Sequence, residues 1–431
     1  MNIWSSSEIH SQIENIIFNL TAALACDTVK LTMIKRILSQ KITSLSKKFP
    51  VITITGPRQS GKTTLVKSVF KDYSYISLED PDEREFAASD PKGFLRRLPE
   101  NVILDEIQRT PVLFSYIQGI VDEKYVPGRF IFTGSNQFHL MKNITQTLAG
   151  RTAVVNLFPF SLSELLSKPA FNPISIESLT ETKCIKPSLN IENYLFKGFY
   201  PPVYDKGYEP YDWFSGYYRT YVERDIREIA NITNLEAFQK FIHLCAGRCG
   251  QILNLSSLAS DAGISHTTAR SWISVLEASF IVHVLPPHHS NFSKRIIKSP
   301  KLYFLDTGLL CYLLRIKTPD DVLTHFMKGQ IFENFVFLEL FKSFANIGEI
   351  PPLYFWRDKT GHEIDFIIDD GKKLIPIEAK SGETVTSSFY DGLKFFKNLG
   401  GKDISKTGVL VHGGNALYKR NEISTIPWYC I

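Results

Sequence analysis

One segment of the chain has the residue types and spacing that bind phosphate. Residues 56–63 read Gly-Pro-Arg-Gln-Ser-Gly-Lys-Thr and match the pattern GxxxxGK[ST] at every position. An apolar run over residues 51–55 precedes the segment, and a helix is expected from about Thr64. Glycines let consecutive backbone N–H groups surround phosphate oxygens, and the helix points the positive end of its dipole at the same charge. The segment therefore predicts a nucleotide site, and an incidental glycine turn is the weaker interpretation.

The polar groups of this loop have expected partners. We expect Lys62 to reach the β- and γ-phosphates and Thr63 to ligate Mg²⁺, which makes ATP and Mg²⁺ the expected cofactors. Nine consecutive residues are expected to bind the nucleotide: Gly56, Pro57, Arg58, Gln59, Ser60, Gly61, Lys62, Thr63 and Thr64.

Two adjacent carboxylates follow a second apolar run. Residues 102–104 read Val-Ile-Leu and predict a buried strand, after which come Asp105 and Glu106. We expect Asp105 to hold the magnesium ion, directly or through water. We expect Glu106, on the other side of the backbone, to polarise the attacking water. Two acids that open a solvated loop are the alternative, which the phosphate loop upstream disfavours.

Two further polar side chains are candidates for the same site. A third apolar run, residues 129–133, is followed by Gly134, Ser135 and Asn136, and we expect Asn136 to sense the γ-phosphate. Arg151 precedes another expected strand, where an arginine stabilises transition-state charge in its own subunit or in a neighbour's site. A surface arginine that caps the preceding helix is the alternative for Arg151.

A second group of chemically active side chains lies near the C-terminus. Residues 363–368 and 374–380 are expected to form two strands of a hairpin, joined by a polar turn. Because side chains alternate along a strand, one face of this hairpin gathers Asp365, Glu378 and Lys380. The pattern resembles the PD-(D/E)xK nuclease-like core. In that core two carboxylates bind a divalent ion and the lysine steadies the water that attacks a phosphodiester.

An upstream acid completes the expected metal site. Glu333, in the helical run of residues 331–344, matches the additional acidic position of the nuclease-like core, so Glu333, Asp365 and Glu378 are the expected metal ligands. The residue before Asp365 is Ile364, whereas the motif has proline at this position. Two alternatives stay open: a hairpin whose polar face is simply solvated, and a nuclease-like fold without catalytic activity.

Alternating strands and helices must position the first group of side chains. Five expected strands are separated by helix-compatible segments: residues 51–55, 75–78, 101–104, 130–133 and 153–157. This alternation predicts an α/β fold built on a parallel sheet. With the phosphate loop, the expected fold class is the parallel sheet of a P-loop NTPase.

A helix-turn-helix pattern lies between the two groups. Residues 256–262 and 267–278 predict two short helices hinged at residues 263–265, and residues 280–285 and 301–305 are expected to pair as a wing. The second helix would present polar side chains to a major groove, which makes double-stranded DNA the expected partner. Seven basic side chains are expected to form a local patch beside it: His283, His288, His289, Lys294, Arg295, Lys298 and Lys301. An ATPase lid or a protein-docking module is the alternative.

Several segments resemble known families. Four of them together resemble an AAA-type ATPase of the additional-catalytic-glutamate class: GPRQSGKTTL, VILDEIQ, FTGSN and LAGRTAVVNLFPFSLSEL. Later segments resemble a prokaryotic family that pairs such an ATPase with a C-terminal domain of unknown function: YVERDI, SPKLYFLDTGLL, EIDFII and IPIEAKSG. The resemblance runs from about Ile34 to the end and implies ATP binding.

These patterns predict five regions along the chain. They are an N-terminal extension (1–33), an AAA-type ATPase core (34–167), a connecting loop and helical lid region (168–250), a winged helix-turn-helix (251–306) and a PD-(D/E)xK nuclease-like domain (307–431). Residues 168–189 are expected to be a loop, because Pro, Ser, Thr and Asn fill them without periodicity.

Composition constrains the remaining choices. The formal net charge is +5, from 49 Lys and Arg against 44 Asp and Glu, so a nucleic-acid surface must be a local patch. The six cysteines lack zinc spacing, and we expect reduced thiols in a cytoplasmic protein. No apolar stretch reaches the length of a membrane span, so no membrane partner is expected. The oligomeric state stays open.

The combined hypothesis is an ATP-binding and ATP-hydrolysing protein that associates with DNA. Its nucleotide state would be coupled to the winged helix and, in the strongest form, to a metal-dependent nuclease domain. The alternative is a nucleotide-dependent regulatory switch that recruits a protein partner, with a catalytically silent nuclease-like domain. A small-molecule kinase is a third hypothesis. It is disfavoured because Glu106 and residues 135–136 suit activation of water better than a substrate hydroxyl.

Overall fold

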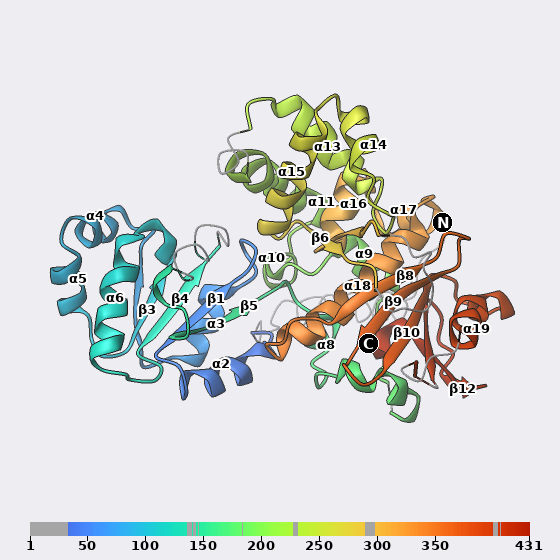
Figure 1. The fold of residues 1–431 in the computed structure, drawn as a ribbon, viewed down its shortest axis with the longest axis horizontal. Helices are drawn as coiled ribbons and strands as arrows, with labels where there is room; N and C mark the ends of the chain where they lie inside the picture. The colour runs from blue at the N-terminus through green and yellow to red at the C-terminus, as the bar shows by residue number, and fades with distance from the viewer. Residues whose placement is uncertain are drawn as a thin grey trace, which may run out of the picture. The chain divides into compact units, whose positions relative to one another are not determined.

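A computed structural model shows the sheet that the sequence predicts around the phosphate loop (Figure 1). The structure describes residues 33–135, 140, 144, 146–182, 184–226, 232–288, 298–399, 404–405 and 407–431. Five parallel strands lie in the order β2-β3-β4-β1-β5: β1 (Val51–Thr55), β2 (Ser74–Ser77), β3 (Val102–Asp105), β4 (Phe130–Gly134) and β5 (Thr152–Asn156). The observed bounds lie within one residue of the expected ones, so the parallel α/β sheet is confirmed.

Apolar helices cover both faces of this sheet. One face packs against α4 (Pro81–Ser89), α5 (Pro91–Arg97) and α6 (Val112–Glu123), and the other against α2 (Leu38–Ser46) and α3 (Lys62–Val69). All residues of β1 and β4 are buried, which explains their continuous apolar character. Because the strands are parallel, their carboxyl ends share one edge, and the candidate residues that follow β1, β3 and β4 meet there.

Short helices follow β5. They are α8 (Leu162–Leu165), η2 (Pro173–Glu181), α9 (Ile191–Lys197), α10 (Pro201–Asp205), α11 (Pro210–Tyr217), η3 (Tyr218–Ile226) and α13 (Leu235–Ala246). Residues 36–431 form one compact unit. Within the parts of the chain that the structure describes, no helix combines the length and apolar character needed to cross a bilayer.

Two helices and a hairpin occupy the region of the expected helix-turn-helix. α14 (Leu255–Ala262) ends at Gly263, whose φ of 72° lies in the left-handed region that glycine favours. Ser265 caps α15 (His266–Ala278) by accepting a hydrogen bond from the Thr268 amide at 3.0 Å. β6 (Val282–Leu285) and β7 (Lys301–Phe304) then pair antiparallel. The elements lie where the sequence predicts them, whereas the winged-helix assignment stays a prediction.

A mixed six-stranded sheet forms the C-terminal part of the chain, in the order β12-β13-β11-β10-β9-β8. Its strands are β8 (Leu353–Arg357), β9 (Glu363–Asp369), β10 (Leu374–Lys380), β11 (Gly408–His412), β12 (Tyr418–Arg420) and β13 (Ile423–Pro427). β9 and β10 form the expected antiparallel hairpin. α18 (Lys328–Asn346) and α19 (Asp391–Asn398) both contact β10 and lie on opposite sides of the sheet (Figure 1).

Both faces of the hairpin are buried, which removes one alternative. Phe366 packs toward α18, whereas Ile367 belongs to an apolar cluster with Phe396 of α19. Asp365 and Glu378 are only 8% and 4% exposed. The interpretation of a hairpin with a solvated polar face is therefore wrong, because a helix covers each side of the sheet.

Two helices connect β7 to α18. α16 (Thr307–Leu313) and α17 (Pro319–Thr324) both contact α9, and α16 also contacts α11. Residues 307–324 therefore pack with the helices that follow β5, although the sequence analysis assigns them to the last domain. The five domain boundaries stay predictions.

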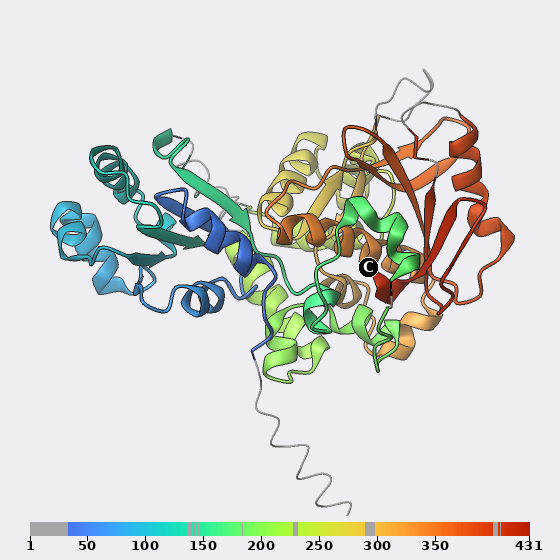
Figure 2. The ribbon, with the colours of Figure 1, turned by 90° about the horizontal axis from the view of Figure 1, so that it is seen from below.

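Part of the expected loop at residues 168–189 forms the helical segment η2. This segment packs against β11 and β13, and both ribbon views show the green segment beside the red strands (Figures 1 and 2). Its Glu177 carboxylate accepts a hydrogen bond from Lys373 at 3.2 Å, and the Ser424 hydroxyl donates to the Glu177 carbonyl at 2.8 Å. The segment is thus tied to the edge of the C-terminal sheet by polar contacts.

Cysteines take two forms among the described residues. Cys184 and Cys430 form a disulfide, so the expectation of reduced thiols is wrong for this pair. Cys245, Cys249 and Cys311 are free and buried. These three thiols are therefore part of the protein core.

Candidate functional site

The phosphate loop connects β1 to α3, and two glycines shape it. Gly56 has a φ of 146°, and a Cβ at this position would lie 2.2 Å from the Leu157 carbonyl oxygen, so only glycine fits. Gly61, with a φ of 92°, is the N-cap of α3. The helix starts at Lys62, two residues before the expected Thr64. The free amides of its first turn therefore lie next to the loop, as phosphate binding requires.

Lys62 is buried and bonded to the loop itself. Its Nζ donates to the carbonyl oxygens of Gly56 at 3.0 Å and Pro57 at 2.8 Å. Burial lowers the pKa of Lys62 to about 8, although the charges of Glu106 and Asp105 oppose the shift. The two acceptors are neutral, and an ammonium group bonds more strongly to phosphate oxygens than to carbonyls. The contacts of Lys62 are therefore ones that a nucleotide phosphate can replace.

The two expected magnesium ligands of this site face each other. Thr63 Oγ1 lies 3.1 Å from Oδ2 and 3.4 Å from Oδ1 of Asp105. Asp105 is the last residue of β3 and is buried, whereas Thr63 stands in the first turn of α3. Hydroxyl and carboxylate oxygens are the ligand types that Mg²⁺ takes beside nucleotide phosphates. The residues present therefore fit a nucleotide-bound Mg²⁺.

Two side chains from the neighbouring strands hold the Asp105 carboxylate. The Tyr75 hydroxyl on β2 donates to Oδ2 at 2.6 Å, and the Thr133 hydroxyl on β4 donates to Oδ1. Neither residue was expected in the site from its sequence pattern. Thr133 belongs to a buried, mostly apolar strand, whereas Tyr75 belongs to the half-buried edge strand β2, and neither strand carries a motif that marks these residues.

Glu106 is held beside the same edge by polar partners. Its backbone, with φ 55° and ψ 42°, lies in the left-handed region, which is uncommon for a residue other than glycine. The carboxylate accepts a hydrogen bond from Ser135 Oγ at 3.0 Å and another from Gln108 Nε2. Ser135 follows β4, and β4 lies between β1 and β3. Asn136, the expected sensor, lies outside the described residues.

Arg151 lies at the wrong edge of the sheet to serve the loop of its own subunit. Parallel register pairs Val51, the first residue of β1, with Thr152, so Arg151 is at the amino ends of the strands. The phosphate loop follows their carboxyl ends. The Arg151 guanidinium instead pairs with Asp122 at 2.9 Å on the surface. A role in its own site is therefore wrong, and a role in a neighbour's site stays a prediction.

A buried arginine that the sequence analysis missed supports the loop from behind. Arg36 donates to the Ser60 carbonyl at 2.8 Å and forms an ion pair with Glu164 at 3.1 Å. The two side chains are almost fully buried and 128 residues apart in the chain, so no local pattern could reveal the pair. Another loop residue, Arg58, places its guanidinium over the ring of Tyr221 at 5.7 Å.

Two members of the expected basic patch are buried inside the protein, and a third, His283, is half-buried and stacks on Phe337. Lys301 is 2% exposed, and burial lowers the pKa of His283 to about 4. His288 bonds to Asp369 at 3.1 Å and is also buried. Their assignment to a DNA-binding surface is therefore wrong, whereas Lys298 is exposed. The remaining three members lie outside the described residues: His289, Lys294 and Arg295.

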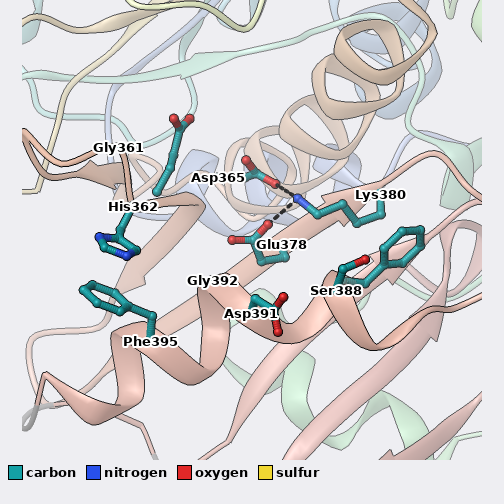
Figure 3. Close-up of a pocket in the computed structure, with 11 residues that line it drawn as sticks. Gly361, His362, Asp365, Glu378, Lys380, Ser388, Asp391, Gly392 and Phe395 are labelled. Carbon is teal, nitrogen blue, oxygen red and sulfur yellow. Dashed lines mark hydrogen bonds and ion pairs between the residues drawn. The ribbon is translucent and has the colours of Figure 1, made fainter.

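The C-terminal hairpin brings its three expected catalytic side chains together. Asp365, Glu378 and Lys380 line a cavity of about 620 Å³, which His362 and Phe395 close on another side (Figure 3). Lys380 Nζ lies 3.5 Å from Asp365 Oδ2 and 2.5 Å from Glu378 Oε2. The sequence therefore predicted the neighbours correctly, and the structure adds that the lysine bridges the two carboxyl groups.

The two bridged carboxyl groups differ in how readily they ionise. Burial, followed by the charge of Asp365, raises the pKa of Glu378 well above 4.5. Burial also opposes ionisation of Asp365, but Lys380 and Lys301 outweigh it and lower the pKa of that carboxyl. Asp365 accepts a further hydrogen bond from the Ala379 amide at 2.9 Å, which fixes its orientation. Two adjacent buried carboxyl groups that repel each other are residues that fit a divalent cation.

Glu333, the third expected metal ligand, is engaged by two side chains of β7. Lys301 Nζ lies 2.8 Å from Glu333 Oε1, and the Tyr303 hydroxyl donates to the same oxygen at 2.6 Å. Lys301 also pairs with Glu363. Burial disfavours the charged form of Lys301, but Glu333, Asp365 and Glu363 outweigh it and raise the pKa, so the ammonium stays charged. In the described parts of the chain no three His, Cys, Asp or Glu side chains converge on one point, so the three-ligand metal site stays a prediction.

Comparisons with known families divide the chain into three matched segments. Residues 48–166 match the family described as "AAA domain", and this part of the chain is an AAA-type P-loop domain. Residues 188–320 match "Domain of unknown function (DUF8612)". Residues 328–431 match "Domain of unknown function (DUF4143)". The first segment contains the phosphate loop, Asp105 and Glu106, and the last contains the C-terminal cavity.

Curated relatives span most of the chain. "Uncharacterized protein Rv2008c" of Mycobacterium tuberculosis is 28% identical over 372 residues, which are 85% of this chain and 78% of that protein. "Uncharacterized protein MJ1544" of Methanocaldococcus jannaschii is 26% identical over 352 residues, which are 77% of this chain and 75% of that protein.

Solved structures show weaker likeness. The Walker-type ATPase PABY2304 of Pyrococcus abyssi is 13% identical, with a TM-score of 0.38, and covers 64% of this chain and 94% of its own. The RuvB Holliday junction branch migration motor of Thermotoga maritima is 16% identical, with a TM-score of 0.28, and covers 58% of this chain and 87% of its own. TM-scores of this size support no inference about this chain.

Proposed function

We propose that the AAA-type domain binds and hydrolyses ATP with the residues around its phosphate loop. The loop amides and Lys62 bind the phosphates, Thr63 and Asp105 hold Mg²⁺, and Glu106 takes a proton from the attacking water. A Mg²⁺ ion held there would neutralise charge on the phosphates. The observation that carries the proposal is the contact of Thr63 with Asp105 beside a Glu106 carboxylate that Ser135 holds.

The setting of Glu106 favours hydrolysis over transfer to a small molecule. β4 separates β1 from β3, so Glu106 stands one strand away from the loop, and Ser135 lies between them. This arrangement suits a water molecule between the carboxylate and the phosphate. It gives no dedicated support to a substrate hydroxyl, which a small-molecule kinase needs.

Contact with double-stranded DNA through α15 is the second part of the proposal. Its first turns expose His266, Thr267, Arg270 and Ser271, and no acidic residue lies in the first turn. The N-terminal residues of such a helix contact base edges and phosphates in a helix-turn-helix. Lys298, exposed just before β7, adds a positive charge.

Charge reversal tests the DNA part directly. Arg270→Glu and Lys298→Glu should each weaken duplex binding by about tenfold or more and reduce its salt dependence, because each contact with phosphate releases a counterion. Lys92→Glu, exposed on α5 and away from both proposed nucleic-acid sites, is the matched control. Equal affinities for all three variants would remove DNA from the proposal.

In the third part of the proposal, Asp365 and Glu378 hold a divalent metal ion, and Lys380 steadies the water that attacks a phosphodiester. The raised pKa of Glu378 supports this reading, because the charge of Asp365 contributes to the shift and a bound cation would relieve that repulsion. The metal ion would supply charge neutralisation at the phosphodiester. ATP state would then govern access to this cavity.

A specific observation favours the alternative of a silent nuclease-like domain and a recruited protein partner. Three carboxylates of the cluster already pair with cations of the chain: Glu333, Glu363 and Asp365 with Lys301, Arg357 and Lys380. Burial disfavours the charged form of the fourth, Glu378. Carboxylates that are already paired have little attraction for a divalent cation. In this alternative the chain's own cations neutralise the carboxylates, as a metal ion does in an active nuclease.

Two assays run together decide between these functions. ATP hydrolysis and plasmid nicking are measured for the unaltered chain, Lys62→Ala and Asp365→Asn, with Mg²⁺ or Mn²⁺. Lys71→Ala, an exposed lysine just beyond α3, is the matched control for the first variant. Hydrolysis at a normal rate by Lys62→Ala would refute the ATPase. Nicking that requires Asp365 and responds to ATP supports the nuclease, whereas intact plasmid in every reaction supports the silent domain.

A further inference from the structure

A tyrosine on the strand next to β3 reaches the expected magnesium ligand. The Tyr75 hydroxyl donates to Asp105 Oδ2 at 2.6 Å, shorter than the 3.1 Å contact of Thr63 with the same oxygen. Parallel register places Tyr75 opposite Ile103 and Ser77 opposite Asp105. The phenol therefore leans along the sheet by two residue positions, toward the carboxyl ends of the strands where the phosphate loop lies.

The helix after the phosphate loop holds the ring of this tyrosine. Lys67 Nζ lies 3.4 Å from the centroid of the Tyr75 ring. Lys67 is four residues after Thr63 on α3, so the two side chains share one face of the helix. That face thus contacts Asp105 through Thr63 and contacts the ring through Lys67. Tyr75 is fixed at both ends by the elements that form the nucleotide site.

We infer that Tyr75 is a positioning residue for Asp105 and that it sets the affinity of the nucleotide site for Mg²⁺. The inference rests on the proposed ATPase. The χ2 torsion of an aspartate is soft, so donors on its oxygens decide where its remaining lone pairs point. Thr133 holds Oδ1 and Tyr75 holds Oδ2. Removal of the phenol leaves Oδ2 without its shortest donor and lets the carboxylate turn away from Thr63.

The phenol is suited to this role, because its hydroxyl donates a hydrogen bond and an ionised carboxylate oxygen only accepts one. Partners that orient a metal ligand in this way typically change metal affinity or activity by about 10- to 100-fold when they are removed.

The test measures nucleotide binding with and without the metal. A fluorescent ADP analogue is titrated against the full chain in EDTA and again in saturating Mg²⁺, for the unaltered protein and for Tyr75→Phe. We expect equal affinities in EDTA and a loss of about tenfold in the Mg²⁺-dependent gain for Tyr75→Phe. Tyr73→Phe, just before β2, is the matched control and should behave like the unaltered chain. Mn²⁺ binding to the ADP complex, followed by electron paramagnetic resonance, should weaken by the same factor.

A second variant separates positioning from a general loss of structure. In an Asp105→Asn background the Tyr75→Phe change should have no further effect on the Mg²⁺-dependent gain, because the two residues act through one contact. Equal weakening in EDTA and in Mg²⁺ would overturn the inference, as would an unaltered Mg²⁺ response in Tyr75→Phe. If the unaltered chain binds no ADP analogue in either buffer, the proposed function fails and this inference fails with it.

Discussion

Replacement of Lys301 by methionine should destabilise the C-terminal part of the protein strongly. Lys301 is a cation with 2% side-chain exposure between Glu333 and Glu363, and methionine keeps the length of its stem. Glu363 retains Arg357 at 3.0 Å after the change, so the carboxylate left without a cation is Glu333. The side chain of Glu333 is only 15% exposed, which prevents water from replacing the lost partner.

The expected magnitude follows from the burial of this pair. Removal of one partner of a buried ion pair costs about 3–5 kcal/mol, because an uncompensated charge remains in the interior. With a urea m-value of about 2 kcal/mol/M, the unfolding midpoint should fall by about 1.5–2.5 M. Lys301→Met combined with Glu333→Gln should recover most of the loss, since the second change removes the unpaired charge.

The loss should depend on pH in one direction. Burial raises the pKa of Glu333 above 4.5 in the folded chain, and Lys301 is the largest influence that opposes the shift. Without Lys301 the folded pKa rises further, so the folded variant takes up a proton before the unfolded chain does. The destabilisation is therefore complete above the folded pKa and shrinks as the pH falls toward 4.5.

Urea unfolding followed by tryptophan fluorescence checks this prediction, because Trp356 is buried in the C-terminal sheet. Lys397→Met is the matched control. Its pair with Glu422 has a similar length, 2.9 Å, but that carboxylate is 61% exposed, so the change should cost less than about 1 kcal/mol. If Lys301→Met lowers the midpoint no more than Lys397→Met at pH 7, Lys301 does not compensate a buried charge and the reasoning is refuted.

Three further changes have definite expected outcomes. Glu106→Gln should keep ADP affinity within about twofold and slow ATP hydrolysis by about 10²- to 10⁴-fold, because the amide accepts no proton from water. Gly56→Ala should abolish nucleotide binding through its clash with the loop backbone, whereas Gly216→Ala, with open space around its Cβ, should leave binding intact in the same titration. Cys184→Ser should lower the stability by about 2–5 kcal/mol, and a reductant should lower the melting temperature of the unaltered chain but not that of the variant, because only the former has the bond to Cys430.

The first site was largely predictable because its signals are local in sequence. The glycine pattern of residues 56–63 specifies its own backbone, and Gly56 and Gly61 adopt the positive φ values that their positions imply. Parallel strands then place whatever follows them at one edge. The position of Asp105 and Glu106 beside the loop could therefore be predicted without knowledge of tertiary contacts. The same topology excludes Arg151 from the site of its own subunit. Arg151 precedes β5, so it lies at the amino ends of the parallel strands, and this could have been deduced from the sequence.

Partners distant in the sequence could not be predicted. Arg36 and Glu164 are separated by 128 residues, and nothing in either neighbourhood marks them as a pair. Lys301 was expected at the surface because a lysine in a basic run is usually solvated. Lys301 is buried because it pairs with Glu333, which is 32 residues away in the chain and lies on helix α18. Residue type reports charge but not the location of the counter-charge, and that location decides between a surface patch and an internal ion pair.

Each candidate site contains a lysine, and the two lysines differ in the charge of the groups to which they bond. Lys62 bonds to two neutral carbonyl oxygens, so phosphate oxygens offer it a stronger interaction and no ion pair has to break. Lys380 bonds to Asp365 and Glu378, so a metal ion must displace a cation that already balances the Asp365 carboxylate. The exchange at the nucleotide site is therefore favourable from the outset. The exchange at the C-terminal cavity needs an additional anion, such as a bound phosphodiester, to draw Lys380 away. Metal binding at the cavity should accordingly be detectable with a nucleic acid present and weak in its absence.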